Sequence, residues 1–595
     1  MKIEDYALIG NLRTAALIAL DGSMDWLCVP RFDAGACFAA LLGTPDHGRW
    51  LLRPADESAR VERKYLQDTL ILETRYQTSS GSVRVLDYMP IAELPVVTRI
   101  VEGVSGCVSL RSELVIRFDY GHIVPWVRSR EGRWTAVAGP DALDLETAIP
   151  LRGEGLTSVA EFEVHEGERI PFSLRWFPSH EQSPPTQDAR STLAQTETFW
   201  RDWAGRSTDD GPHRDDIVRS LITLKALTYA PTGGIIAAPT TSLPEVIGGS
   251  RNWDYRYCWL RDSTFTLYAL LHGGYADEAA AFHDWLLRAV AGDPGKVQIC
   301  YGLAGERRLQ ETELPWLPGY EASQPVRIGN AASLQLQLDV YGEVSDTLHQ
   351  ARRCGIDSDE PSWAFQRAHT EWLEQAWSEP DQGLWEMRGP PQQFTHSKVL
   401  AWVALDRAVK AIEQHGFEGP LERWRSVRAD IHASVCERAF STKKNSFTQA
   451  YDSDALDASL LLIPAVGFLG GDDERVLGTI RAVERELLQD GLVRRYVTAE
   501  RTSADGLAGQ EGVFLACSFW LVDAYVLTGQ PEKGQALFDR LLTLKNDVGL
   551  LAEEYEPAQK RLLGNFPQAY SHVALINSAR NLTQTRSPGQ HRKST

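Results

Sequence analysis

SKVLAWVALDRAVKAI, residues 397–412, carries apolar side chains at steps of three and four residues, which is the period of an amphipathic helix. AASLQLQLDVYGEV (331–344) repeats this pattern. Because similar segments follow one another along most of the chain, we expect about twelve helices, at 214–230, 262–274, 276–292, 330–352, 361–376, 396–414, 419–440, 454–463, 473–489, 511–528, 531–546 and 568–583. Helices in this number can pair as hairpins and close into an all-α (α/α)6 barrel, and a superhelical stack is the alternative.

The first part of the chain has a different pattern. Short β-rich segments such as TLILETRYQT (69–78) and SVRVLDYMP (82–90) are separated by turns, which is typical of an antiparallel β-sandwich. The predicted organisation is therefore an N-terminal β-sandwich at 1–188, a helical linker at 189–212, the (α/α)6 barrel at 213–583 and a flexible tail at 584–595.

Composition excludes several classes of function. A net charge of −19 disfavours nucleic acid, because phosphate binding needs a surplus of Lys and Arg. The longest apolar stretch (458–471) is short and is broken by Pro464, so we expect no membrane span. No secretory signal is visible, and the eight Cys show no CxxC spacing, which predicts a cytoplasmic protein with free thiols. Without a metal or nucleotide motif we expect no metal and no cofactor. The sequence is compatible with either a monomer or a homo-oligomer.

The segments between the predicted helices are unequal in length, and the long ones are rich in Trp, Tyr, Gly and Pro. Long ordered loops on a compact scaffold are usually functional, and these lie at 233–261, 293–329, 377–395, 490–510 and 547–567. Arg261 and Asp262 stand where the first of them becomes a helix. Asp262 could simply cap that helix, or the pair could grip the vicinal hydroxyls of a sugar.

Motifs in these loops resemble glycoside hydrolase family 15, the family of glucoamylases and bacterial trehalase-like proteins. The resemblance covers nearly the whole chain, and residues 3–43 look like the N-terminal β-domain of the bacterial branch. The motifs that carry it are DYRYCWLRDS (254–263), QPVRIGNAA (324–332), GLWEMRG (383–389) with FTHSK (394–398), VRRY (493–496), GQEGVFLACSFWL (509–521), AEEYEP (552–557) and GNFPQAYSH (564–572).

The resemblance assigns roles to particular residues. Glu386 matches the general acid and Glu553 the general base of an inverting hydrolase. Arg261 and Asp262 match the pair that holds the non-reducing glucose. The remaining expected contacts of the sugar substrate are Tyr255, Trp259, Trp385, Arg495 and Glu511. The implied activity is release of β-D-glucose from trehalose or from short malto- or isomalto-oligosaccharides.

Acid and base can share one reaction only if their surroundings separate their pKa values. We expect Trp385 and Met387 to desolvate Glu386 and raise its pKa, whereas Glu553 stands in an acidic run where ionisation should cost less. Met387 is also a departure, since fungal glucoamylases carry a second carboxylate directly after the acid. This difference puts a strict maltose or starch preference in doubt.

Two other functions compete with hydrolysis. A disaccharide phosphorylase of similar architecture would use phosphate in place of activated water, and it would need an anion site and no base. A carbohydrate-binding or sensing protein would keep the pocket without turnover. The base-like setting of Glu553 and the presence of both acids favour the hydrolase.

Overall fold

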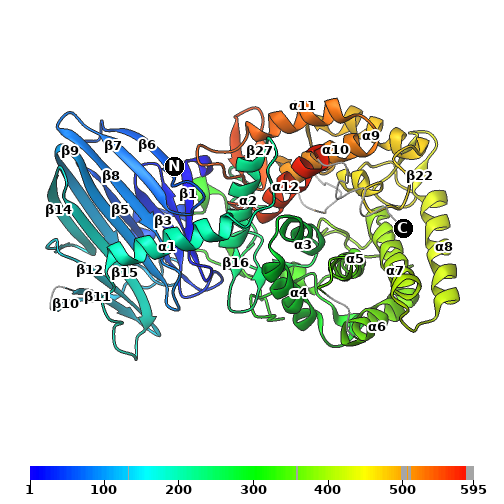
Figure 1. The fold of residues 1–595 in the computed structure, drawn as a ribbon, viewed down its shortest axis with the longest axis horizontal. Helices are drawn as coiled ribbons and strands as arrows, with labels where there is room; N and C mark the ends of the chain where they lie inside the picture. The colour runs from blue at the N-terminus through cyan, green and yellow to red at the C-terminus, as the bar shows by residue number, and fades with distance from the viewer. Residues whose placement is uncertain (131–132, 357–359, 498–505, 507–508, 510, 584–595) are drawn as a thin grey trace.

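The computed structural model describes residues 1–130, 133–356, 360–497, 506, 509 and 511–583. A β-rich N-terminal part and a helical part lie next to each other along the long axis of the molecule (Figure 1). The predicted flexible tail (584–595) lies outside the described residues.

The N-terminal part contains two antiparallel sheets that share the long strand β9, which confirms the expected β architecture. Residues 96–106 of β9 pair with β8 and β15, and residues 107–115 pair with β5 and β14. Gly103 and Gly106 lie where β9 leaves one sheet for the other. A Cβ on Gly103 would meet the His165 carbonyl oxygen at 2.0 Å, so only glycine fits this crossing.

The strands of this part run in the order β1 (Tyr6–Gly10), β2 (Ala15–Ala19), β3 (Ser23–Cys28), β4 (Ala36–Phe38), β5 (Arg49–Pro54), β6 (Arg60–Tyr65), β7 (Leu72–Gln77), β8 (Gly81–Tyr88), β9 (Val96–Val115), β10 (Trp126–Arg130), β11 (Arg133–Ala138), β12 (Asp141–Thr147), β13 (Arg152–Glu154), β14 (Thr157–His165) and β15 (Arg169–Pro178).

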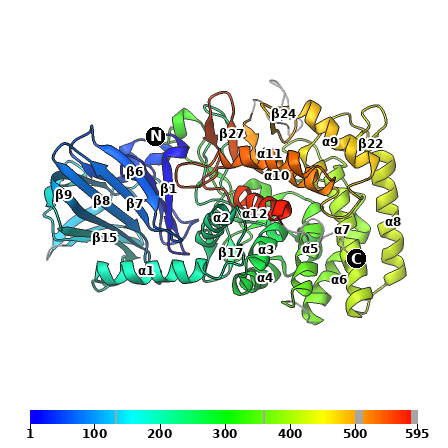
Figure 2. The ribbon, with the colours of Figure 1, turned by 45° about the horizontal axis from the view of Figure 1, so that its top comes forward.

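Helix α1 (Ala189–Ala204) connects the two parts and runs along the sheets (Figures 1 and 2). Its first residue accepts a hydrogen bond from the Tyr88 hydroxyl at 2.7 Å, and near its end the Trp203 indole donates to Glu278 of the helical part at 2.6 Å. The exact domain boundaries given above stay a prediction.

The helical part forms a double ring, which confirms the (α/α)6 barrel. Neighbouring inner helices pack against one another around the ring, and each outer helix packs on its inner partner. The inner ring consists of α3 (Ser263–His272), α5 (Asp339–Arg353), α7 (Thr395–His415), the 3-10 turn η7 (Ala458–Leu462), α10 (Leu515–Leu527) and α12 (Ala569–Thr583). The outer ring consists of α2 (Arg214–Ala226), α4 (Ala276–Val290), α6 (Glu360–Ala376), α8 (Leu421–Arg438), α9 (Glu474–Glu486) and α11 (Pro531–Leu542).

Burial follows this arrangement. Inner helix α5 is buried at nearly every position, whereas outer helix α8 buries only Trp424, Ile431 and Val435. A helix that is covered on all sides belongs in a core, and one with a single apolar stripe belongs at the surface.

Two predicted helices were wrong in detail. The segment 330–352 is a 3-10 turn at Ala331–Leu334 followed by α5, because Gln335 is extended and interrupts the helix. The segment 454–463 contains only η7. Asp457 caps the start of η7 by accepting a hydrogen bond from the Ser459 N–H, and Pro464, two residues after its end, disfavours a longer helix. Within the described ranges, every helix is too short or too polar to cross a membrane.

Candidate active site

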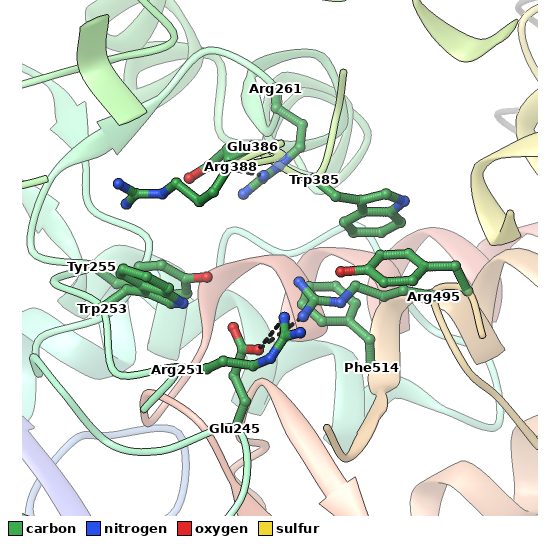
Figure 3. A pocket seen from close by; sticks show the side chains of 11 residues that line it. Glu245, Arg251, Trp253, Tyr255, Arg261, Trp385, Glu386, Arg388, Arg495 and Phe514 are labelled. Atoms are coloured by element: carbon green, nitrogen blue, oxygen red, sulfur yellow. Dashed lines mark hydrogen bonds and ion pairs between the residues drawn. The ribbon is translucent and has the colours of Figure 1, made fainter. Parts of the chain in front are cut away.

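A cavity opens among the loops that lead into the N-terminal ends of inner helices α3, α7 and α10. In Figure 3, Glu386 and Arg388 occupy one wall, and Glu245 and Arg251 occupy the opposite wall. The lining residues are Glu245, Arg251, Trp253, Tyr255, Arg261, Trp385, Glu386, Arg388, Arg495, Tyr496 and Phe514.

Glu386 is presented by a tight turn. Its backbone has a φ of 57°, a left-handed conformation that few non-glycine residues adopt, and Gly383 at the start of the turn has a φ of 66°. Its Oε1 accepts a hydrogen bond from Trp259 Nε1 at 2.8 Å and from Arg261 Nη1 at 3.2 Å. The carboxylate of Glu386 is thus held by polar donors from the loop before α3, and the expected desolvation by Trp385 and Met387 stays a prediction.

The neighbours of Glu386 face other parts of the protein. Trp385 lines the cavity, but its Nε1 points away from the acid and donates to both carboxylate oxygens of Asp457 at 3.0 Å. Met387 is 1% exposed and packs in the apolar core. Met387 therefore fills space behind the turn, and the residue that returns to the cavity is Arg388.

Arg261 and Asp262 form the expected pair. Arg261 Nε donates to Asp262 Oδ1 at 2.8 Å, and Arg261 Nη1 also donates to the Leu384 carbonyl at 3.3 Å. Burial raises the pKa of the Asp262 carboxyl, and the Arg261 charge lowers it in part. The guanidinium of Arg261 thus links the start of α3 to the Glu386 turn. Asp262 itself is not among the residues that line the cavity.

The loop before α3 is anchored by the N-terminal part. Arg256 is buried, forms two hydrogen bonds with Asp254 and donates to the Ala34 carbonyl at 3.0 Å. Tyr255, between them, packs edge-on against Trp259 with ring centroids 5.2 Å apart. The β-sheets therefore support the segment that carries Tyr255 and Trp259.

Glu553 is fully enclosed beside the cavity. Its Oε2 accepts from the Asn565 N–H at 3.3 Å, and its Oε1 has no hydrogen-bond partner among the described residues. Burial raises the pKa of the Glu553 carboxyl above its ordinary value, and the negative charge of Glu245 raises it further. The Tyr255 phenol and the Arg495 guanidinium lower it in part. The expectation that the acidic run makes ionisation of Glu553 easy was wrong.

The local strands explain this burial. β27 (Glu554–Glu556) pairs with β26 (Val513–Phe514) and with β28 (Arg561–Leu563), so the acidic run is the central strand of a small sheet. Gly564 follows β28 with a φ of 72°, and a Cβ there would lie 2.5 Å from Glu553 Oε2. Glycine at 564 is therefore what allows the chain to close over the carboxylate.

Arg495 lies at the centre of a buried ionic cluster. It donates to Glu511 at 2.6 Å and 3.1 Å and to Glu245 at 2.9 Å, and it lies 3.6 Å from Glu554. Arg251 adds a second guanidinium, 3.5 Å from Glu511. Oxygens of Glu245, Glu511 and Glu554 all lie within 4.8 Å of one another, a spacing that could hold a cation. The two guanidinium groups already supply positive charge there.

The predicted site residues divide into two groups. Tyr255, Arg261, Trp385, Glu386 and Arg495 line the cavity. Trp259, Asp262, Glu511 and Glu553 are not lining residues, and all four are buried.

Sequence reasoning missed Glu245, Arg251, Trp253, Arg388, Tyr496 and Phe514. Most of these residues belong to the long aromatic loops 233–261, 377–395 and 490–510. The length and composition of these loops were therefore the sequence feature that could have indicated them. Their individual roles depend on contacts between distant segments.

Comparisons with known proteins show the family and the fold of the chain. The family model for glycosyl hydrolases family 15 matches residues 211–580, and the model for the trehalase-like N-terminal domain matches residues 1–165. A bacterial glucoamylase complexed with acarbose has the same fold, with a TM-score of 0.72 at 12% identity over 98% of this chain and 94% of the glucoamylase.

Curated relatives match over nearly the whole chain. The trehalase of Mycolicibacterium smegmatis is 40% identical, over 97% of this chain and 90% of the relative. The trehalase of Thermoplasma volcanium is 34% identical, over 98% of this chain and 94% of the relative. The family model and relatives at this identity show that the chain is a glycoside hydrolase that belongs to glycosyl hydrolases family 15.

Proposed function

We propose that the protein is an exo-acting, inverting α-glucoside hydrolase that releases β-D-glucose from the non-reducing end of trehalose or of short malto- and isomalto-oligosaccharides. One observation carries this proposal: the Glu386 carboxylate lines a cavity, and Glu553 is buried against Tyr255, which lines the same cavity. The names of the curated relatives support trehalose as the first substrate to test.

Glu386 is the proposed general acid. Cleavage of the bond between C1 and the glycosidic oxygen leaves negative charge on that oxygen unless a proton is supplied. Glu386 lies at the cavity surface, where a glycosidic oxygen can reach it, and the Trp259 and Arg261 contacts keep its carboxyl in one orientation. Arg261, which Asp262 holds in place, also provides N–H donors for the hydroxyls of the glucose that is attacked.

Glu553 is the proposed general base. It takes a proton from the water whose oxygen forms the new bond to C1 on the face opposite to the leaving group. Its enclosure among Tyr255, Gly564 and Asn565 fixes the carboxylate directly beside the cavity. A carboxylate accepts hydrogen bonds only, so an ionised Glu553 is suited to orient and deprotonate a water molecule.

The direct test measures glucose release from trehalose, maltose and isomaltose by three variants. Glu386→Gln and Glu553→Gln should each lower kcat/KM by roughly a hundredfold to ten-thousandfold, the usual contribution of a general acid or base. Glu554→Gln is the matched control, because Glu554 is the adjacent residue and is equally buried.

The control should retain most of the activity. Near-wild-type hydrolysis by either the Glu386 or the Glu553 variant would contradict the proposal. Phosphate-dependent release of glucose 1-phosphate would favour a phosphorylase instead, and sugar binding without turnover would favour a binding protein.

A further inference from the structure

The outer rim of the cavity holds a group of residues that no role above uses. Arg388 Nη2 lies 3.2 Å from Glu311 Oε2, and its guanidinium carbon lies 4.6 Å from the ring centroid of Trp253. Arg327 approaches the same ring at 4.7 Å and lies 3.9 Å from the other oxygen of Glu311. Arg388 is therefore held in place by an ion pair and a cation–π contact.

Exposure shows which end of the cavity is open. Arg388 is exposed, whereas Trp385 and Tyr255 are buried. The buried end carries Arg261 and Arg495, and the exposed end carries Arg388 and Trp253, which Figure 3 shows near each other on the side away from Trp385. A sugar chain that extends from the buried end towards solvent must pass Arg388.

The turn that carries Glu386 also places Arg388. Gln335 Nε2 donates to the carbonyl oxygens of Glu386 and Met387, at 3.2 Å and 3.1 Å, which fixes the backbone between the two side chains. Met387 turns into the core, and Arg388 returns to the wall that Glu386 occupies. Acid and guanidinium thus lie on the same wall, two residues apart, with the guanidinium nearer the opening.

We propose that Arg388 binds the leaving sugar and makes the enzyme select for a leaving group that is itself a hexose. This inference rests on the proposed function of Glu386, because the oxygen that receives the proton belongs to the leaving sugar. That sugar must lie between Glu386 and the opening, where Arg388 is. The guanidinium has five N–H donors, and the described contacts with acceptors use one of them, the bond to Glu311.

The remaining donors of Arg388 can bind two neighbouring hydroxyl oxygens of a neutral sugar, because the planar fork matches vicinal acceptors. Glu311 keeps the guanidinium from turning to solvent and acts as a positioning residue. The position directly after the acid carries Met387, which is buried, so Arg388 is the nearest polar side chain of this turn on the leaving-group side.

The test compares two substrates of the whole enzyme. Trehalose has a glucose as its leaving group, whereas α-glucosyl fluoride releases fluoride and places no sugar beside Arg388. For Arg388→Gln, the ratio of kcat/KM for trehalose to kcat/KM for the fluoride should fall about 10- to 100-fold, the effect of losing hydrogen bonds from a charged donor. Glu311→Gln should lower the same ratio less, since it frees Arg388 without removing it.

Arg327→Gln is the matched control. Arg327 contacts the same tryptophan and the same glutamate but does not line the cavity, so its ratio should stay near that of the wild type. An unchanged ratio for Arg388→Gln would overturn the role of Arg388 and leave the hydrolase assignment intact. A wild-type enzyme that hydrolyses neither substrate would overturn the proposed function and this inference with it.

Discussion

Glu245→Gln should move the acidic limb of the kcat/KM profile for trehalose to lower pH. A general base works only when it is ionised, so kcat/KM falls as the pH drops through the pKa of Glu553 in the free enzyme. Burial sets that pKa above its ordinary value, and the negative charge of Glu245 raises it further. Removing the charge therefore lowers the pKa of Glu553 and extends activity into more acidic solution.

The size of the shift follows from the contacts of Glu245. A charge near a carboxyl changes its pKa by roughly one to three units. Because Arg495 lies 2.9 Å from Glu245 and already neutralises part of its charge, we expect the lower end, about one unit, or about 1.4 kcal/mol. Without Glu245, less of the Arg495 charge is neutralised, so Arg495 stabilises the ionised form of Glu553 more strongly. This effect also lowers the pKa of Glu553.

Tyr255→Phe is the companion variant with the opposite sign. The phenol of Tyr255 lowers the pKa of Glu553, so its removal should move the acidic limb to higher pH by about one unit. The assay is the pH dependence of kcat/KM for trehalose in wild type and both variants. Limbs that move in the same direction, or that stay in place, would refute the assignment of the limb to Glu553.

Three further variants test other parts of the account. Glu553→Gln should raise Tm at neutral pH more than at pH 4, because an acid whose pKa is raised by burial loses folded-state stability as the pH rises above its unfolded pKa of about 4.3. Equal Tm gains at both pH values would count against a raised pKa of Glu553. Trp259→Phe should lower kcat/KM for trehalose about tenfold by removing the donor to Glu386, and wild-type rates would show that this bond is dispensable. Gly564→Ala should lower kcat/KM and Tm together, since its Cβ would stand 2.5 Å from Glu553 Oε2, and a fully active variant would argue against this tight closure.

Helical periodicity predicted the barrel because five of the six inner elements, α3, α5, α7, α10 and α12, are α-helices of at least ten residues. The failures came where local chemistry ended a helix early, as Asp457 and Pro464 do around η7. The aromatic loops located the cavity, and the motifs in these loops pointed to Glu386, Arg261 and Arg495, which all line it.

The environment of each carboxylate could not be predicted from its neighbours in the chain. Glu553 stands in an acidic run, yet the small sheet of β26, β27 and β28 encloses it. Glu386 stands beside a tryptophan, yet the indole that contacts it belongs to Trp259, which is 127 residues away. Glu245 had no local signal, because its role comes from the contact with Arg495, 250 residues distant.

The anomeric configuration of the first products tests the central claim most directly. Proton NMR can follow the hydrolysis of trehalose before the released glucose equilibrates. Inversion at the attacked C1 gives β-glucose, and the leaving sugar keeps its α configuration, so the account predicts equal initial amounts of the two anomers. Initial formation of α-glucose alone would show retention and would contradict the assignment of Glu386 as acid and Glu553 as base for an attacking water.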